Sequence, residues 1–293
     1  MRSEIKNMKY RFMRYPEGKT KAVTFSYDDG CTTDMKFLSV LDKYGLRATL
    51  NLYSARFTEN AQEGAIEEFR EKALGAGHEI AVHGKWHKAP GLLSPVECIR
   101  DTLDCRLELE SIFDTVIRGM AYPDSGIRIF SGQNNYETVR ELLVSLGIVY
   151  ARTLGEDNDS FLLPKDWYAW MPTVHNKNPK AMEWAESFVK IKVNECYCSR
   201  RYPRLFYMWG HTPEFENTNS WDMLEDMCRL FSEDEDIWAA TNIEIYNYVR
   251  AYESLVISAD GSRFYNPTLI DVWFNYDGKD YCVPSGEKLK IQL

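Results

Sequence analysis

The stretch Ala22-Val-Thr-Phe-Ser-Tyr-Asp-Asp-Gly30 decides how the chain folds. Its first six residues are mostly apolar, aromatic or β-branched, which is typical of a buried β-strand. Two aspartates and a glycine then end the strand, because these residues favour turns at strand exits. The stretch therefore predicts a buried strand over 22–27 that carries two adjacent carboxylates, Asp28 and Asp29, at its carboxyl end.

Strand-like and helix-like patterns alternate from this stretch to about residue 250. Six further strands are predicted at 47–53, 78–83, 116–122, 148–152, 205–209 and 237–240. The predicted helices cover 35–44, 61–74, 95–113, 136–146, 179–196, 220–231 and 243–252. Such β–α units favour parallel strands with crossover helices, in either a barrel or a doubly wound sheet. After about residue 255 the pattern changes to a hairpin, with strands at 269–274 and 281–283 around Asp277-Gly278 and a further strand at 289–293.

The composition is that of a globular chain that can bury a full core. With 35 Lys and Arg against 44 Asp and Glu, the 293 residues carry a net charge of −9. This acidity argues against a nucleic-acid-binding protein, and no uncharged apolar stretch approaches the ~18 residues that a membrane-spanning helix needs. The seven cysteines form no CxxC pair, which indicates free thiols in a reducing compartment. We expect a cytoplasmic protein, with removal of a signal peptide as the alternative.

Residues with catalytic chemistry gather at the predicted carboxyl ends of the strands, where α/β enzymes place their sites. Asp28 and Asp29 follow the first strand, His83 and His87 the third, and His211 the sixth. One aspartate and two histidines supply three ligands and leave a position open for water, which is typical of a catalytic metal site. The other aspartate is then free to act as a base. Taken alone, Asp28-Asp29 is more typical of a turn, and His211 also fits a structural core histidine.

The remaining histidines and several absent motifs narrow the choice further. His78 opens the third strand at its amino end and is expected to be structural, while His175 lies in an irregular loop and is given no role. The sequence has no GxSxG, GxxxxGK or GxGxxG motif. Serine hydrolases, P-loop NTPases and dinucleotide-dependent enzymes are therefore disfavoured.

Two of these stretches together resemble motifs of the polysaccharide deacetylase family, the NodB-homology domain. Ser26-Tyr-Asp-Asp-Gly30 is similar to its first motif, Thr-Phe-Asp-Asp-Gly. Gly77-His-Glu-Ile-Ala-Val-His-Gly-Lys-Trp-His87 is similar to its second, Gly-His-Glu-Ile-x-x-His-(Ser/Thr)-x-x-His. Tyr122-Pro123 followed by Gly126 loosely resembles the third motif, and His211 stands where the last motif has its catalytic histidine.

The resemblance implies a distorted (β/α)7 TIM-like barrel over residues 20–252, with a lead-in at 1–19 and a β-hairpin extension at 253–293. It also implies a hydrolase that removes N-acetyl groups from N-acetylated sugars or polysaccharides and depends on a divalent metal. Zinc is the expected ion, with cobalt or nickel as alternatives. Asp28 corresponds to the general base and His211 to the general acid. The corresponding metal ligands are Asp29, His83 and His87.

Two departures from the family pattern concern the site. Gly84 stands where the second motif has Ser or Thr, which removes a hydroxyl that often helps to orient the site. The third motif's arginine, which pairs with the base, aligns with Ala121, and Arg118 or Arg152 could replace it. Substrate contacts are expected from Tyr122, Pro123, Trp170 and Trp209. The bulk of the two tryptophans leaves the identity of the substrate open.

Three functions remain open from the sequence. The first is deacetylation of an N-acetylated sugar, and the second is hydrolysis of an acetyl ester, as in acetylated xylan, or of a cyclic amide. The third is a non-catalytic carbohydrate-binding barrel, although the eight Trp and 18 Tyr suit a large core better than sugar stacking. The expected partner is a carbohydrate, and the negative charge disfavours a strongly anionic glycan. Neither nucleic acid nor a membrane is expected, and the oligomeric state is not indicated.

Overall fold

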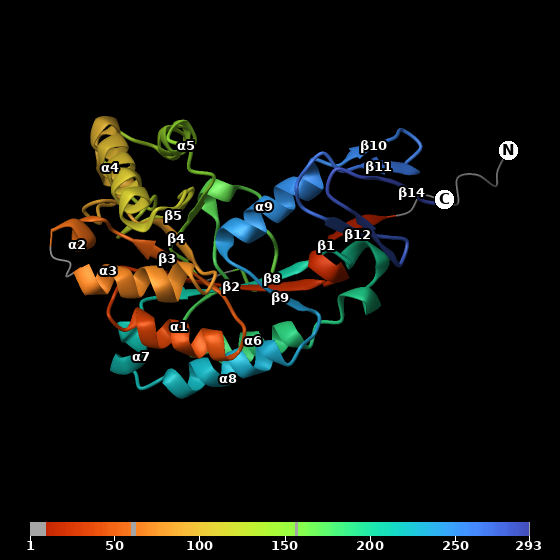
Figure 1. The fold of residues 1–293 in the computed structure, drawn as a ribbon, viewed down its shortest axis with the longest axis horizontal. Coiled ribbons are helices and arrows are strands. Elements are labelled where there is room, and N and C mark those ends of the chain that lie inside the picture. The colour runs from red at the N-terminus through yellow and green to blue at the C-terminus, as the bar shows by residue number, and fades with distance from the viewer. Residues whose placement is uncertain (1–9, 60–62, 156–157, 293) are drawn as a thin grey trace.

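The centre of the computed structural model, which describes residues 10–59, 63–155 and 158–292, is a curled parallel sheet (Figure 1). Its strand order is β6-β5-β4-β3-β2-β8-β7, and β9 pairs with β2. The strands are β2 (Lys21–Asp28), β3 (Ala48–Leu52), β4 (Glu79–Val82), β5 (Gly119–Ala121), β6 (Tyr150–Arg152), β7 (Val174–His175), β8 (Arg204–Gly210) and β9 (Ile237–Ala239). All eight residues of β2 are buried, because β8 flanks it on one side and β9 and β3 share the other.

Helices lie around this sheet, and the view in Figure 1 separates them into two groups. Below the sheet are α1 (Asp34–Lys43), α6 (Ala181–Val189) and α8 (Trp221–Ser232), and above it are α4 (Pro95–Phe113), α5 (Tyr136–Ser145) and α9 (Asn242–Glu253). The short helices are α2 (Ala55–Thr58), α3 (Glu63–Phe69), α7 (Pro213–Asn217), η2 (Pro16–Gly18), η4 (Pro90–Leu92), η5 (Trp167–Ala169), η6 (Val193–Glu195) and η7 (Cys198–Arg200). This arrangement confirms the α/β class and the distorted (β/α)7 barrel.

The sequence signals account for the clearest helix boundary. Ser94 Oγ accepts a hydrogen bond from the N–H of Glu97, whose carboxylate accepts one from the N–H of Ser94. Pro95 occupies the first turn of α4, where its missing N–H leaves no bond unmade. The predicted start of this helix is therefore confirmed.

The region between β6 and β8 differs from the prediction. β7 was not predicted, because a strand of two residues is too short to produce a pattern. The barrel closes next to it through a single parallel bridge between Arg152 and Trp170. The helix predicted over 179–196 ends at Val189, since the backbone is no longer helical at Lys192. The helix predicted over 61–74 consists of α3 and the π-helix η3 (Arg70–Leu74), with residues 61–62 outside the described part.

Beyond α9 the chain forms two small antiparallel sheets with a core of their own. The predicted hairpin is present as β12 (Val272–Tyr276) and β13 (Lys279–Val283), and both residues of its turn have positive φ, as a two-residue turn of this kind requires. β1 (Arg11–Arg14) pairs with β12, so the lead-in joins the extension. The second sheet contains β10 (Val256–Ile257), β11 (Arg263–Tyr265) and β14 (Lys288–Lys290).

Among the described residues, no helix is both long enough and apolar enough to cross a membrane.

Candidate active site

Asp28 and Asp29 reach the same site although they are neighbours in the chain. Successive side chains of a strand point to opposite faces, but Asp29 leaves strand geometry with a φ of 81°. Both carboxylates therefore approach His83, with Asp28 Oδ2 at 3.8 Å and Asp29 Oδ1 at 3.7 Å from its Nε2. Gly30 follows at a φ of 69°, where a Cβ would lie 2.9 Å from the ring of Phe57. The turn therefore requires glycine at this position.

Asp29, His83 and His87 form a cluster of three ligand atoms within 4.8 Å of one another. Asp29 Oδ1 lies 3.7 Å from His83 Nε2 and 3.4 Å from His87 Nε2. This oxygen is buried, yet it accepts no hydrogen bond from the described residues, which is the situation of an atom that binds a cation. One carboxylate and two imidazoles suit zinc, cobalt or nickel. The residues therefore fit the predicted metal.

The orientation of His83 supports this role. Its Nδ1 lies 2.9 Å from the carbonyl oxygen of Ala121. Because a carbonyl only accepts, Nδ1 carries the proton and the lone pair of Nε2 is directed toward Asp29. Burial lowers the pKa of His83 and favours the neutral imidazole that a metal requires.

Asp28 does not belong to the ligand cluster and has protein partners of its own. Arg152 Nη2 donates to Oδ2 at 2.5 Å, and Asn51 Nδ2 donates to Oδ1 at 2.8 Å. Burial alone would raise the pKa of Asp28, but the charges of Arg152 and two nearby histidines, together with the Arg152 hydrogen bond, lower it. An ionised carboxylate outside the ligand set is suited to take up a proton.

Arg152 is the arginine for which the sequence left two candidates. It is fully buried at the carboxyl end of β6, and its guanidinium lies 4.3 Å from the ring centre of Trp209. The other candidate, Arg118, is exposed and precedes β5, at the amino end of the sheet. The buried position next to an aromatic face holds the guanidinium in one orientation toward Asp28.

His211 follows β8 and lies beside the same carboxylates. Its Nε2 is 3.9 Å from Asp29 Oδ2, and its Nδ1 is 3.3 Å from Glu214 Oε1. Burial would lower the pKa of His211, but the hydrogen bond to Glu214 and the negative charges of Asp28 and Asp29 raise it. The imidazole is thus kept protonated to higher pH, which suits a proton donor.

Glu214 is a site residue that the sequence analysis missed. It lies in the first turn of the short helix α7, and its carboxylate is 3.5 Å from His175 Nε2 and 2.9 Å from Lys177 Nζ. Burial would raise its pKa, but hydrogen bonds with His211 and Lys177 lower it to about 2. His175, His211 and Glu214 have ligand atoms within 4.8 Å of one another, but the Lys177 ammonium already neutralises the carboxylate. The spacing His-x-x-Glu was the only available signal.

Gly84 also has a structural explanation. A Cβ at this position would lie 2.4 Å from Asp101 Oδ2, and its φ is 73°. Asp101, which projects from α4, accepts the N–H of Trp86 at 2.9 Å, and its own carbonyl accepts the N–H of Lys85 at 3.0 Å. A buried carboxylate from a neighbouring helix thus occupies the space of the missing Ser or Thr side chain and fixes the loop between His83 and His87.

The four residues predicted to contact substrate are all buried in the structure. Trp170 has no exposed surface and packs edge-on against Tyr150 and Tyr207, so the prediction that it contacts substrate is wrong. The Tyr122 side chain is also fully buried and donates to the carbonyl of Tyr168, so its predicted contact is wrong as well. Their large apolar surfaces are used in the core. Pro123 is buried beside the histidine loop.

The fourth of these residues, Trp209, lies at the candidate site, beside Arg152. Its ring lies between the Arg152 guanidinium and His175, whose ring centre is 4.5 Å away, and its Nε1 donates to the Gly155 carbonyl. Only 7% of the residue is exposed. Substrate contact by Trp209 stays a prediction.

The polysaccharide deacetylase family model matches residues 15–151. The resemblance inferred from the sequence is confirmed. The matched region contains the aspartate pair and the histidine loop but ends before Arg152 and His211. A comparison with curated proteins finds no match.

Solved structures of polysaccharide deacetylases and of an acetyl xylan esterase are similar to this fold. A protein from Mycobacterium smegmatis assigned to the polysaccharide deacetylases has 17% identity and a TM-score of 0.53, over 82% of this chain and 93% of its own. A family 4 acetyl xylan esterase from Clostridium thermocellum, solved with cobalt, has 16% identity and a TM-score of 0.47, over 77% and 90%. The peptidoglycan deacetylase PdaC from Bacillus subtilis has 18% identity and a TM-score of 0.45, over 82% and 96%. With 17% identity and a TM-score above 0.5, the first of these structures supports the fold and nothing beyond it. The other two have TM-scores below 0.5 and carry no argument.

Proposed function

We propose that this protein is a metal-dependent hydrolase that removes N-acetyl groups from an N-acetylated sugar or polysaccharide. The observation that carries the proposal is the division of labour between two adjacent carboxylates. Asp29 faces two imidazoles and has an unused buried oxygen, whereas Asp28 is bound to Arg152 and remains outside the ligand cluster. A metal ligand and a separate base at one strand end are what hydrolysis by activated water requires.

The chain's residues divide the proton transfers between them. A divalent ion held by Asp29, His83 and His87 supplies Lewis acidity, which lowers the pKa of water and polarises an amide carbonyl. Asp28 takes the proton as water attacks, and Arg152 keeps that carboxylate ionised and oriented. His211 protonates the departing amine, and Glu214 raises the pKa of His211 so that its imidazole is protonated at higher pH.

The non-catalytic alternative rested on the missing third-motif arginine. The ion pair between Arg152 and Asp28 supplies the same charge from another strand, which supports an intact catalytic site. Hydrolysis of an acetyl ester or a cyclic amide uses the same groups and differs only in the product. The seven unpaired cysteines support a reducing compartment such as the cytoplasm.

The test is to incubate the zinc-loaded protein with chitooligosaccharides, acetylated xylan and small N-acetyl sugars, and to measure acetate and free amine separately. Equal amounts of acetate and amine are expected. Acetate without amine would replace the proposal by an esterase, and no release with zinc, cobalt or nickel would contradict a hydrolase. An Asp28→Asn protein serves as the inactive control.

A further inference from the structure

Trp86 is the most exposed of the eight tryptophans in this chain. It is 49% exposed, whereas the other seven are buried or half-buried. It lies in the loop between the two histidine ligands, directly before His87. Folding normally places an indole in the core, so a tryptophan left exposed beside a reaction site indicates a contact that folding itself does not make.

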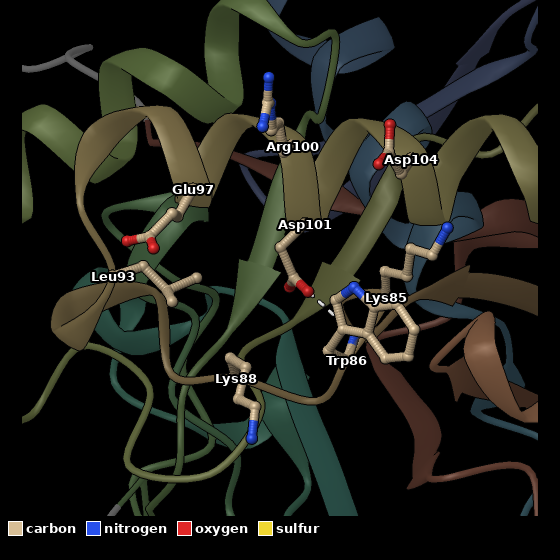
Figure 2. Close-up of a pocket in the computed structure, with 8 residues that line it drawn as sticks. All are labelled: Lys85, Trp86, Lys88, Leu93, Glu97, Arg100, Asp101 and Asp104. Carbon is tan, nitrogen blue, oxygen red and sulfur yellow. Dashed lines mark hydrogen bonds between the residues drawn. The ribbon is translucent and has the colours of Figure 1, made fainter.

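A surface cavity of about 410 Å³ lies beside this side chain, between the histidine loop and α4. Figure 2 shows the indole at one end of the cavity and Leu93 and Glu97 at the other, with Asp101 between them. Apart from Trp86 and Leu93, its lining consists of three basic and three acidic side chains. The cavity therefore combines an aromatic face with many hydrogen-bond donors and acceptors but has no net charge.

The loop that carries Trp86 is held against α4. The backbone N–H of Trp86 donates to Asp101 Oδ1 at 2.9 Å, and the Lys85 ammonium lies 5.4 Å from the indole ring centre. Lys85 is itself bound to Glu108 of α4 at 2.5 Å. A loop held in this way loses little backbone entropy when a ligand binds, so less of the contact energy is spent on ordering it.

We propose that this cavity is a sugar subsite, in which Trp86 stacks on a ring of a neutral oligosaccharide whose acetylated residue lies at the metal cluster. This inference rests on the proposed function and names its substrate as a chain rather than a single sugar. The balanced charges favour hydroxyl and acetamide groups over an anionic ligand. The peptide bond between Trp86 and His87 places the indole within a few sugar residues of the reaction site.

The test measures binding separately from turnover. In the zinc-loaded Asp28→Asn background, the dissociation constants of tetra-N-acetylchitotetraose and N-acetylglucosamine are measured by titration calorimetry, with and without Trp86→Ala. Loss of a stacking partner is expected to weaken tetrasaccharide binding about tenfold and to leave the monosaccharide within about twofold. Tyr197→Ala is the matched control, because Tyr197 is 75% exposed and precedes β8, at the opposite end of the sheet.

The outcomes separate the subsite from the proposed function. If the tetrasaccharide is not preferred, the titration is repeated with acetylated xylotetraose, and no effect of Trp86→Ala in either series overturns the subsite. Equal weakening of short and long ligands, or a weaker zinc affinity, also overturns it, because Trp86 would then act through the metal loop. If the wild-type protein releases no acetate while Trp86→Ala still weakens tetrasaccharide binding, the proposed function fails and the subsite stands.

Discussion

The two ends of the barrel each contain a buried carboxylate, and their environments push the two pKa values in opposite directions. At the carboxyl end, Asp28 is bound to the Arg152 guanidinium, and its pKa is lowered. At the amino end, Glu79 accepts hydrogen bonds from Tyr150, Thr49 and the N–H of Ile243, which are all neutral. Burial raises the pKa of Glu79 to about 7.

The difference shows what keeps a buried carboxylate ionised. Burial disfavours the charge at both ends, so a fixed cation is needed to keep one group ionised. Glu79 has no such cation among its hydrogen-bond partners in the described part of the chain, and it joins β4 to the first turn of α9. The carboxyl end therefore favours an ionised carboxylate, and the amino end favours a protonated one up to about pH 7.

The largest expected effect on activity comes from neutralising Asp28 at the carboxyl end. The matching substitution at the amino end, Glu79→Gln, is the control. Asp28→Asn is expected to lower the rate of acetate release about 10³-fold, because the base is lost while the metal ligands remain. Glu79→Gln should change the rate less than about threefold. Chelator competition should show equal zinc affinity in both variants and the wild type, and an active Asp28→Asn protein would contradict the assignment of the base.

The second prediction removes the cation. Arg152→Met is expected to lower acetate release about 100-fold at pH 6 and by less at pH 8. Without the guanidinium, the pKa of Asp28 rises, so the acidic limb of the pH–rate profile moves to higher pH. Arg152→Lys, which keeps a positive charge, should show a smaller shift. An unmoved acidic limb in Arg152→Met would show that the ion pair does not control the base.

The third prediction concerns the proton donor. Glu214→Gln removes a negative partner of His211, so the pKa of this histidine falls and activity is lost at lower pH on the basic side. A decrease of about tenfold at pH 8 is expected, with little change at pH 6. Glu216→Gln on the same short helix, where Glu216 pairs with Lys36 at the surface, is the matched control. Equal losses at both pH values would indicate a structural role for Glu214 instead.

The smallest effect is on stability at the amino end. The pKa of Glu79 is about 7 in the folded protein and about 4.3 in the unfolded chain. The contribution of protonated Glu79 to the free energy of unfolding is therefore fully present below about pH 4.3 and is lost as the pH rises to about 7. Glutamine keeps the neutral form, with the Tyr150 hydroxyl reversed to accept. From pH 5 to pH 8, denaturant titrations should show the variant gaining on the order of 2 kcal/mol in unfolding free energy relative to the wild type.

A difference in unfolding free energy between the two proteins that stays constant from pH 5 to pH 8 would mean that folding does not shift the pKa of Glu79. The amino end would then hold its carboxylate in the same charge state as the carboxyl end, and the comparison would fail.

The sequence by itself determined the alternation of strands and helices, the parallel class and the residues of the candidate metal cluster. These features are local: Asp28 and Asp29 are adjacent, and His83 and His87 are four residues apart, so strand and turn chemistry bring each pair to a strand end. The first two motifs also sufficed to indicate the family. Strand ends in a parallel sheet meet at one edge, which is why distant motifs could be assigned to one site.

Only the tertiary structure decided which side chains complete the site. Arg152 is 124 positions from Asp28, and strand order, not local pattern, places it there while Arg118 faces solvent at the other end. The same holds for Asp101, which fills the space above Gly84 from a separate helix. Trp170 and Trp86 are the same residue type, yet one is buried by the closing bridge of the barrel and the other is left exposed beside a cavity. Burial depends on what packs against a residue, and the chain's local order does not specify that.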